Sequence, residues 1–259
     1  MNLDLDGKVA IVGGASKGIG FAIARILSME GAQVVITARR ETELMAAAQA
    51  IEKESGRAVM HISADCRKSE DCARVVDQVI QRFGGVDILV NNDGAPPLGP
   101  VLSFDDTAWA KAVEQNLMYV VRMTRAVMPS MQERGGGSVL NITAISAIQP
   151  IPGFALSVAT WSGVIGYAKT LSLEVAVHNI NVNTICPGYI DTQRLQKVFA
   201  SGQEPAETVK ARLTQEIPMQ RIGSTDDIAH MVALLVSPRG RYITGTAIQV
   251  DGGLLRAVR

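Results

Sequence analysis

The sequence predicts an α/β fold in which a parallel sheet is covered by helices on both faces. Short runs of branched apolar residues alternate with longer stretches of helical spacing along the whole chain. These runs are apolar at successive positions, which indicates strands that are buried on both faces. No linker, repeat or low-complexity tract divides the 259 residues, so residues 1–259 are expected to form a single domain.

The first part of the chain is expected to contain four strands and three helices. The strands are predicted at 8–12, 33–37, 58–62 and 86–90. The helices are predicted at 19–29, 41–54 and 69–83. Ser69 is the expected N-cap of the third helix, and Gly84 and Gly85 are expected to end it.

The second part continues the alternation with longer helices. Strands are predicted at 138–142, 181–185 and 247–250, which brings the total to seven. Helices are predicted from Asp106 or Thr107 past Met128, at 154–177, and at 225–236 with Ser224 or Thr225 as N-cap. Pro129 is expected to kink or weaken the first of these. Residues 192–216 are interpreted as a helical insert, interrupted near Gly202 and Pro205.

Composition argues against several classes of partner and site. Lys plus Arg and Asp plus Glu number 25 each, so no net charge steers the chain toward nucleic acid or an acidic membrane surface. We expect neither a signal peptide nor a membrane span, because no sufficiently long apolar run occurs. Three cysteines without CxxC spacing favour a cytoplasmic location, and three widely separated histidines predict no metal site.

A glycine-rich turn, Gly14-Ala15-Ser16-Lys17-Gly18-Ile19-Gly20, lies between the first strand and the first helix. Glycines there let the backbone approach a diphosphate, and the helix start supplies N–H groups. Lys17 of this turn and Arg39 and Arg40 after the second strand form a basic cluster. Guanidinium groups bind phosphate oxygens in pairs, so the cluster favours NADP(H) over NAD(H). The alternative is an ordinary solvated helix start.

Asp65 follows the third strand, where a carboxylate can accept a hydrogen bond from an adenine amino group. The alternative is a capping or turn aspartate. Further motifs are Asn91-Asn92-Asp93-Gly94 after the fourth strand, Asn116 within a helix, Pro187-Gly188 after the sixth strand, and the closing TGTAIQVDGG. Together with the glycine turn, and in this order, they resemble the classical short-chain dehydrogenase/reductase family. The most similar branch is that of bacterial 3-oxoacyl-(acyl-carrier-protein) reductase-like proteins.

The resemblance implies a seven-stranded Rossmann fold, a small-molecule substrate and a homotetramer or dimer. It implies that helices 106–128 and 154–177 form the shared face, and that 191–217 covers the substrate cleft. The residues implied to bind the cofactor are Gly14, Ser16, Gly18 and Ile19 at the diphosphate, Arg39 at the 2′-phosphate, Asp65 at the adenine, Asn92 and Gly94 at the adenosine ribose, and Pro187, Gly188, Ile190 and Thr192 at the nicotinamide.

The chain departs from the family at the positions that carry the chemistry. The family uses Asn, Ser, Tyr and Lys, in which Tyr protonates the substrate oxygen and Lys lowers the Tyr pKa. Asn116 is retained, but Ala144, Ser157 and Trp161 occupy the Ser, Tyr and Lys positions. Asp93 replaces a small apolar residue and, like the bulky Trp161, is expected to weaken cofactor binding. Trp161 either stacks on a ligand, fills the nicotinamide site, or simply packs.

The remaining polar residues leave three hypotheses open. Candidate catalytic residues are Asn116, Ser157, Ser146 and Tyr189, although a serine hydroxyl is a far weaker acid than a phenol. The first hypothesis is NADP(H)-linked carbonyl or alcohol redox chemistry by a non-standard or weakened mechanism. The second is a non-redox lyase or isomerase that uses the same cleft. The third is a catalytically silent binding or scaffold subunit.

Overall fold

The computed structural model describes residues 2–92, 94, 96–200 and 204–257. Within them, seven strands form one parallel sheet in the order β3-β2-β1-β4-β5-β6-β7. The strands are β1 Val9–Gly13, β2 Gln33–Ala38, β3 Met60–Ser63, β4 Ile88–Asn91, β5 Gly137–Ile142, β6 Ile180–Pro187 and β7 Ala247–Val250. This confirms the predicted fold class. The order reverses between β1 and β4, and such a reversal places a ligand crevice outside the carboxyl ends of the strands.

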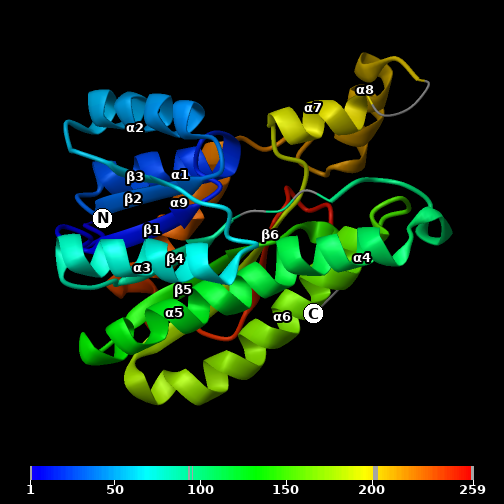
Figure 1. Ribbon diagram of the computed structural model, residues 1–259. Coiled ribbons are helices and arrows are strands. Elements are labelled where there is room, and N and C mark those ends of the chain that lie inside the picture. The colour runs from blue at the N-terminus through cyan, green and yellow to red at the C-terminus, as the bar shows by residue number, and fades with distance from the viewer. Residues whose placement is uncertain (1, 93, 95, 201–203, 258–259) are drawn as a thin grey trace.

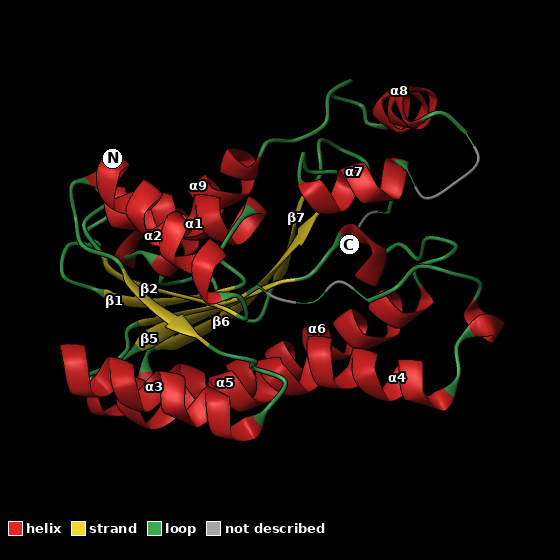
Figure 2. Ribbon diagram, turned by 45° about the horizontal axis from the view of Figure 1, so that its top comes forward, coloured by secondary structure: helices red, strands yellow, loops and turns green. Residues whose placement is uncertain are grey.

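Helices cover both faces of the sheet. They are α1 Gly18–Met29, α2 Glu41–Ser55, α3 Ser69–Phe83, α4 Asp106–Val113, α5 Tyr119–Glu133, α6 Ala155–Val175, α7 Gln193–Phe199, α8 Ala206–Glu216 and α9 Thr225–Val236. Figure 1 shows α1, α2 and α9 on one face and α3, α5 and α6 on the other, and the turned view in Figure 2 shows the same layers. None of the described helices is long and apolar enough to cross a membrane.

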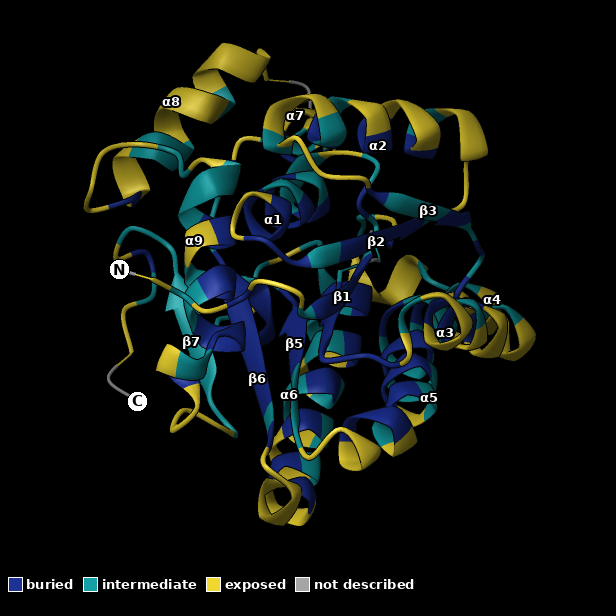
Figure 3. Ribbon diagram, turned by 90° about the vertical axis from the view of Figure 1, so that its left-hand side faces the viewer, coloured by how far each residue is buried: buried dark blue, intermediate teal, exposed yellow. Residues whose placement is uncertain are grey.

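The two faces of the sheet have separate apolar cores. Ala10 and Val12 of β1 lie in the core beneath α1, α2 and α9. Val9 and Ile11 lie in the core beneath α3, α5 and α6. Successive apolar residues therefore serve opposite faces, as the uninterrupted apolar runs predicted, and Figure 3 shows the strands of the sheet centre as buried.

Several predicted boundaries were wrong. The fourth strand begins at Ile88 rather than at residue 86. Ser69 is not an N-cap: it is the first residue of α3, and Lys68 holds the cap position without a side-chain hydrogen bond. By contrast, Asp106, one of the two residues predicted to open the next helix, does begin α4, and its N-cap is Asp105, whose carboxylate accepts from the Ala108 N–H at 2.8 Å. Asp105 caps the helix because its short polar side chain, just outside the first turn, reaches the unpaired backbone N–H groups.

The helix predicted from residue 106 past 128 is not continuous. A π-helical turn, Glu114–Met118, separates α4 from α5 and contains Asn116. Pro129 lies inside α5, which continues to Glu133. The helix predicted to reach residue 177 ends at Val175 and is followed by a 3-10 turn, Ala176–His178.

The segment 191–217, which we call the cover, lies beyond the carboxyl ends of the strands, where Figure 1 shows α7 and α8; its role over a substrate cleft stays a prediction. Pro205 directly precedes α8, as the predicted interruption requires, whereas Gly202 lies outside the described residues. Ile145, Ile217 and Leu254 form a small third core that joins the loop after β5 to the end of this segment. The fold therefore anchors one end of the cover beside the strand ends.

Ser224 caps α9 through a reciprocal capping box, which confirms one of the two predicted caps. Its hydroxyl accepts from the Asp227 N–H at 3.2 Å, and the Asp227 carboxylate accepts from the Ser224 N–H at 2.7 Å. Arg221 donates to the same carboxylate at 2.8 Å. The hydrogen bond from Arg221, followed by that from the Ser224 backbone, holds the pKa of Asp227 well below its usual range.

We expect Asp227→Asn to lower the Tm near neutral pH. The folded-state pKa of Asp227 is lower than its unfolded value of about 4, so its stabilisation is present above about pH 4 and is lost as the pH falls further. Thermal unfolding measured across this pH range should show the Tm of Asp227→Asn approaching the Tm of the native chain as the pH falls. The control is Asp77→Asn on α3, whose Tm should stay near that of the native chain at every pH. A Tm difference between Asp227→Asn and this control that is the same at every pH would contradict the stabilising role of the Asp227 carboxylate.

Candidate functional site

The glycine turn is held in a shape that only glycine fits. Gly14 has φ +57°, and a Cβ there would lie 2.0 Å from the carbonyl oxygen of Asn92. Gly18 also has a positive φ, +60°, but a Cβ there would meet nothing closer than Thr192 Cγ2 at 3.6 Å. The turn is thus packed tightly against β4 on one side and is open on the side that faces α7.

Asn92 fixes the glycine turn from behind. Its Nδ2 donates to the carbonyl oxygens of Gly13 at 3.1 Å and Gly14 at 3.5 Å. A Cβ on the neighbouring Gly94, where φ is +109°, would lie 2.1 Å from Asn116 Oδ1. The end of β4 therefore touches both the glycine turn and Asn116, one of the predicted catalytic residues. Asp93 lies outside the described residues.

The other turn residues connect the glycine turn to the core and to the end of β2. Ser16 and Ile19 are half-buried, and Ile19 also packs on the core beneath α1. The Ala15 N–H donates to the Thr37 carbonyl at 3.2 Å, which ties the turn to the end of β2. The basic residues that follow β2 consequently lie at the same edge of the sheet as the turn.

Glu43, in the first turn of α2, forms ion pairs with two of the three residues of the predicted basic cluster. Its carboxylate lies 3.0 Å from Arg40 Nε and 4.0 Å from Lys17 Nζ. Within the described part of the chain, Arg39 has no carboxylate ion-pair partner, and its backbone carbonyl accepts from the Ser63 hydroxyl at 3.1 Å. Arg39 is therefore the member of the cluster whose guanidinium remains for an incoming phosphate.

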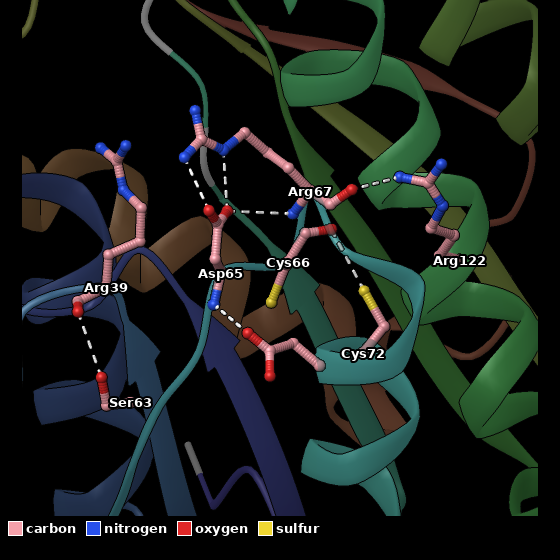
Figure 4. A network of polar contacts seen from close by, with 8 residues as sticks. Arg39, Ser63, Asp65, Cys66, Arg67, Cys72 and Arg122 are labelled. Carbon is pink, nitrogen blue, oxygen red and sulfur yellow. Dashed lines mark hydrogen bonds and ion pairs between the residues drawn. The ribbon is translucent and has the colours of Figure 1, made fainter.

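Asp65 is already engaged by a residue that the sequence analysis missed. Arg67 donates to it from Nε at 2.7 Å and from Nη2 at 2.6 Å (Figure 4). The side-chain hydrogen bond from Arg67 is the largest cause that lowers the pKa of Asp65. Oδ1 also accepts from the Arg67 backbone N–H at 3.3 Å, so Oδ2 is the carboxylate oxygen that keeps a lone pair for an adenine amino group.

The strand β6 delivers the residues expected at the nicotinamide. Gly188 packs on the chain after β7, where a Cβ would lie 2.8 Å from Asp251 Cα. Ile190 is buried, and the Thr192 hydroxyl caps α7 by accepting from the Leu195 N–H at 3.3 Å. These contacts join the start of the cover to β7 and to the first turn of α7. The role of Pro187, Gly188, Ile190 and Thr192 toward a nicotinamide stays a prediction.

Two cavities open beside Tyr189. One of about 310 Å³ is also lined by Arg221, Asp227 and Asp251. The other, of about 220 Å³, lies between the loop after β5 and the cover; its lining includes Ile151, Phe154, Val198, Phe199, Arg212 and Leu213. Burial raises the pKa of the Tyr189 phenol, which makes it a weaker proton donor than a free tyrosine.

The other three candidate catalytic residues do not line either cavity. Asn116, Ser146 and Ser157 are each about 1% exposed. Asn116 Oδ1, Ser146 Oγ and Ser157 Oγ have no hydrogen-bond partner among the described residues. Asn116 Nδ2 donates to the Thr160 hydroxyl at 2.8 Å, and Thr160 in turn donates to the Leu156 carbonyl at 2.7 Å. Thr160, which sequence reasoning missed, thus ties Asn116 to the first turn of α6.

Trp161 packs on the core beneath α3, α5 and α6 and is half-buried. Of the alternatives predicted for it, packing is the one that these contacts support. Within the described part of the chain, no group of three or more His, Cys, Asp or Glu residues is arranged to hold a metal ion.

Comparison with known proteins places these features in context. A family model described as enoyl-(acyl carrier protein) reductase matches residues 14–255. Human dehydrogenase/reductase SDR family member 4 is 36% identical over 250 residues, which cover 96% of this chain and 88% of the human protein. The 3-oxoacyl-(acyl-carrier-protein) reductase of Vibrio cholerae is 35% identical over 252 residues, covering 97% and 99%. L-sorbose reductase from Gluconobacter frateurii, solved with NADPH and L-sorbose, superposes with a TM-score of 0.95 at 33% identity over 100% of both chains.

Proposed function

Because the chain belongs to the classical short-chain dehydrogenase/reductase family, we propose that it binds NADP(H) and transfers hydride between this cofactor and a small carbonyl or alcohol compound. The glycine turn carries the proposal, since Gly14 lets the turn pack against Asn92 from behind, while the face at Gly18 is left open for a diphosphate to approach the start of α1. Arg39 adds an exposed guanidinium at the end of β2. The similar L-sorbose reductase was solved with NADPH, which supports the choice of cofactor.

Each part of the cofactor has residues that fit it. Backbone N–H groups at the start of α1 hold the diphosphate, and Arg39 holds the 2′-phosphate. Asp65 accepts from the adenine amino group while Arg67 keeps its carboxylate oriented. The segment from Pro187 to Ile190 borders the nicotinamide, which supplies or accepts the hydride when bound.

The proposed site lacks a well-placed proton donor. Hydride addition to a carbonyl leaves an alkoxide, which needs a proton. Ala144 has no hydroxyl, Ser157 is buried, and the half-buried Trp161 packs against the core. Tyr189 faces both cavities, but burial raises the pKa of its phenol. Water is therefore the proposed proton donor, and turnover is slow because a positioned general acid contributes about 10²–10⁴-fold.

Arg39→Ala is expected to weaken NADPH binding by about tenfold or more, because hydrogen bonds to charged groups contribute about 1.5–3 kcal/mol. NADH binding should change little, since NADH has no 2′-phosphate. Arg40→Ala is the matched control, because Glu43 already holds Arg40 at 3.0 Å. Calorimetric titration of both cofactors measures the effect; equal losses for NADPH and NADH would remove Arg39 from the 2′-phosphate site.

A catalytically silent nucleotide-binding subunit is the second candidate. The observation that favours it is the burial of Asn116, Ser146 and Ser157, which lie outside both cavities. The same burial weakens the lyase or isomerase hypothesis, since that reaction would need these groups at the substrate. Steady-state NADPH oxidation over a panel of aldehydes and ketones separates the two: any substrate-dependent turnover excludes a silent subunit.

We further propose a homotetramer or dimer whose shared face includes α4, α5 and α6. The outer side of α6 exposes Leu173 at 73% and the following turn exposes Val177 at 80%, which supports an interface there. Light scattering coupled to size exclusion would test this proposal, and a monomer at micromolar concentration would reject it.

A further inference from the structure

Arg194 lies in the first turn of α7 and points toward the loop after β4. Its Nη2 donates to the Pro96 carbonyl oxygen at 2.8 Å. The side chain is half-buried, and burial lowers the pKa of the guanidinium, which nevertheless stays charged at any physiological pH. A positive charge is thus held in partly dehydrated surroundings at the edge of the candidate site.

The contrast with other poorly exposed arginines is informative. The side chains of Arg25, Arg122 and Arg134 are 19%, 16% and 33% exposed, and each has a carboxylate oxygen at 2.7, 2.6 and 2.9 Å respectively. Within the described part of the chain, Arg194 instead pairs with a neutral carbonyl and with no carboxylate. Burial of a charge is costly unless an opposite charge offsets it, so this position suits an external anion.

The location of Arg194 joins three parts of the site. Thr192, two residues earlier, is the nearest side chain to the open face of Gly18. Pro96 belongs to the loop after β4, whose Asn92 holds the glycine turn. Val198, one helical turn after Arg194, lines the 220 Å³ cavity. Arg194 therefore belongs to a segment that borders both the open face of the glycine turn and the cavity, and its guanidinium lies at the Pro96 carbonyl oxygen.

We propose that Arg194 binds an oxyanion, a phosphate or carboxylate group, at the junction of the glycine turn, Pro96 and α7. A guanidinium has five N–H donors in a planar fork, and the bond to Pro96 uses one of them. The remaining donors match two oxygens of one phosphate or carboxylate. The anion comes either from the cofactor diphosphate or from an acidic substrate, and this inference rests on the proposed function for its choice of cofactor.

Arg194→Met removes the charge and keeps much of the apolar stem, and Arg194→Lys keeps the charge without the fork. The control is Arg241→Met, because Arg241 also donates to a backbone carbonyl, that of Pro238 at 3.1 Å, but far from the strand ends. Calorimetry with NADPH and with adenosine 2′-phosphate forms the first arm. Acetoacetate and acetoacetamide, titrated at saturating NADP⁺, form the second arm.

If the anion is the cofactor diphosphate, Arg194→Met should weaken NADPH binding at least about tenfold and leave the binding of adenosine 2′-phosphate unchanged. If the anion belongs to the substrate, Arg194→Met should weaken the binding of acetoacetate to the same extent and leave the binding of acetoacetamide unchanged. Arg194→Lys should recover part of the affinity in either case. Unchanged binding of both NADPH and acetoacetate overturns the proposal, and so does an equal loss for both members of a pair, because that reports lost structure rather than lost charge.

Failure of the proposed function is recognised separately. If the native chain binds neither NADPH nor adenosine 2′-phosphate, the cofactor assignment fails. In that case, titration with inorganic pyrophosphate tests the oxyanion site by itself. Weaker pyrophosphate binding by Arg194→Met than by Arg241→Met supports the site, and equal pyrophosphate affinity of the two variants overturns it.

Discussion

The triple variant Ala144→Ser, Ser157→Tyr and Trp161→Lys is expected to raise kcat for NADPH-dependent carbonyl reduction by about 10²–10⁴-fold. It restores a hydroxyl that holds the carbonyl, a phenol that protonates the oxygen, and an ammonium that lowers the pKa of that phenol. The glycine turn and Arg39 are untouched, so affinity for the cofactor should change far less than the rate. Stopped-flow absorbance of NADPH, mixed with excess carbonyl substrate, measures the step directly.

A matched control separates the phenol from its bulk. Ala144→Ser, Ser157→Phe and Trp161→Lys has the same shape without the hydroxyl and should stay as slow as the native chain. The control matters because Ser157 is 1% exposed and Trp161 packs on a core, so both variants must rearrange the start of α6. Circular dichroism and Tm show whether both fold. Equal rates for the Tyr and Phe variants would mean that proton donation does not limit the native protein.

Gly14→Ala is expected to abolish NADPH binding and to lower the Tm by several degrees or more. A Cβ at Gly14 would lie 2.0 Å from the backbone oxygen of Asn92, and no side-chain rotation can relieve that contact. The positive φ of +57° adds further strain, roughly 1–2 kcal/mol for an L-residue. The turn must therefore move away from β4, which distorts the diphosphate position.

Gly18→Ala isolates the effect of the contact. Its φ of +60° matches that of Gly14, but its Cβ would meet only Thr192 at 3.6 Å. It should therefore carry the conformational cost alone, about 1–2 kcal/mol. Thermal unfolding of both variants gives the comparison, and NADPH binding is compared only between Gly14→Ala and the native chain because Gly18 is itself placed at the diphosphate. If Gly14→Ala melts at the same temperature as Gly18→Ala, the tight approach of the turn to the end of β4 does not shape the turn.

The parts of the fold that follow from local pattern were predictable. The strand at 247–250 was predicted with its observed bounds, and Ser224 was one of two proposed caps for α9. Both depend on residues that are near one another in sequence. Boundaries failed where two local signals competed, as at Ser69, which follows the cap position rather than filling it.

Several contacts of the candidate site were not predictable from the sequence pattern. The π-helical turn at Asn116 has the apolar spacing of an ordinary helix, so periodicity does not reveal it. The pairing of Arg194 with Pro96 spans 98 positions and depends on how the cover meets the loop after β4. Arg67 beside Asp65 is the exception, because a cation two residues from a proposed acceptor could have been considered as its partner.

Calorimetric titration of the native chain with NADPH and with NADH tests the central claim, an intact NADP(H) site beside a lost proton donor. We expect saturable binding of NADPH, and binding of NADH that is weaker by about tenfold or more, because Arg39 is the cation left for the 2′-phosphate. If neither nucleotide gives a heat of binding, or if NADH binds more tightly than NADPH, the claim of an intact NADP(H) site is contradicted.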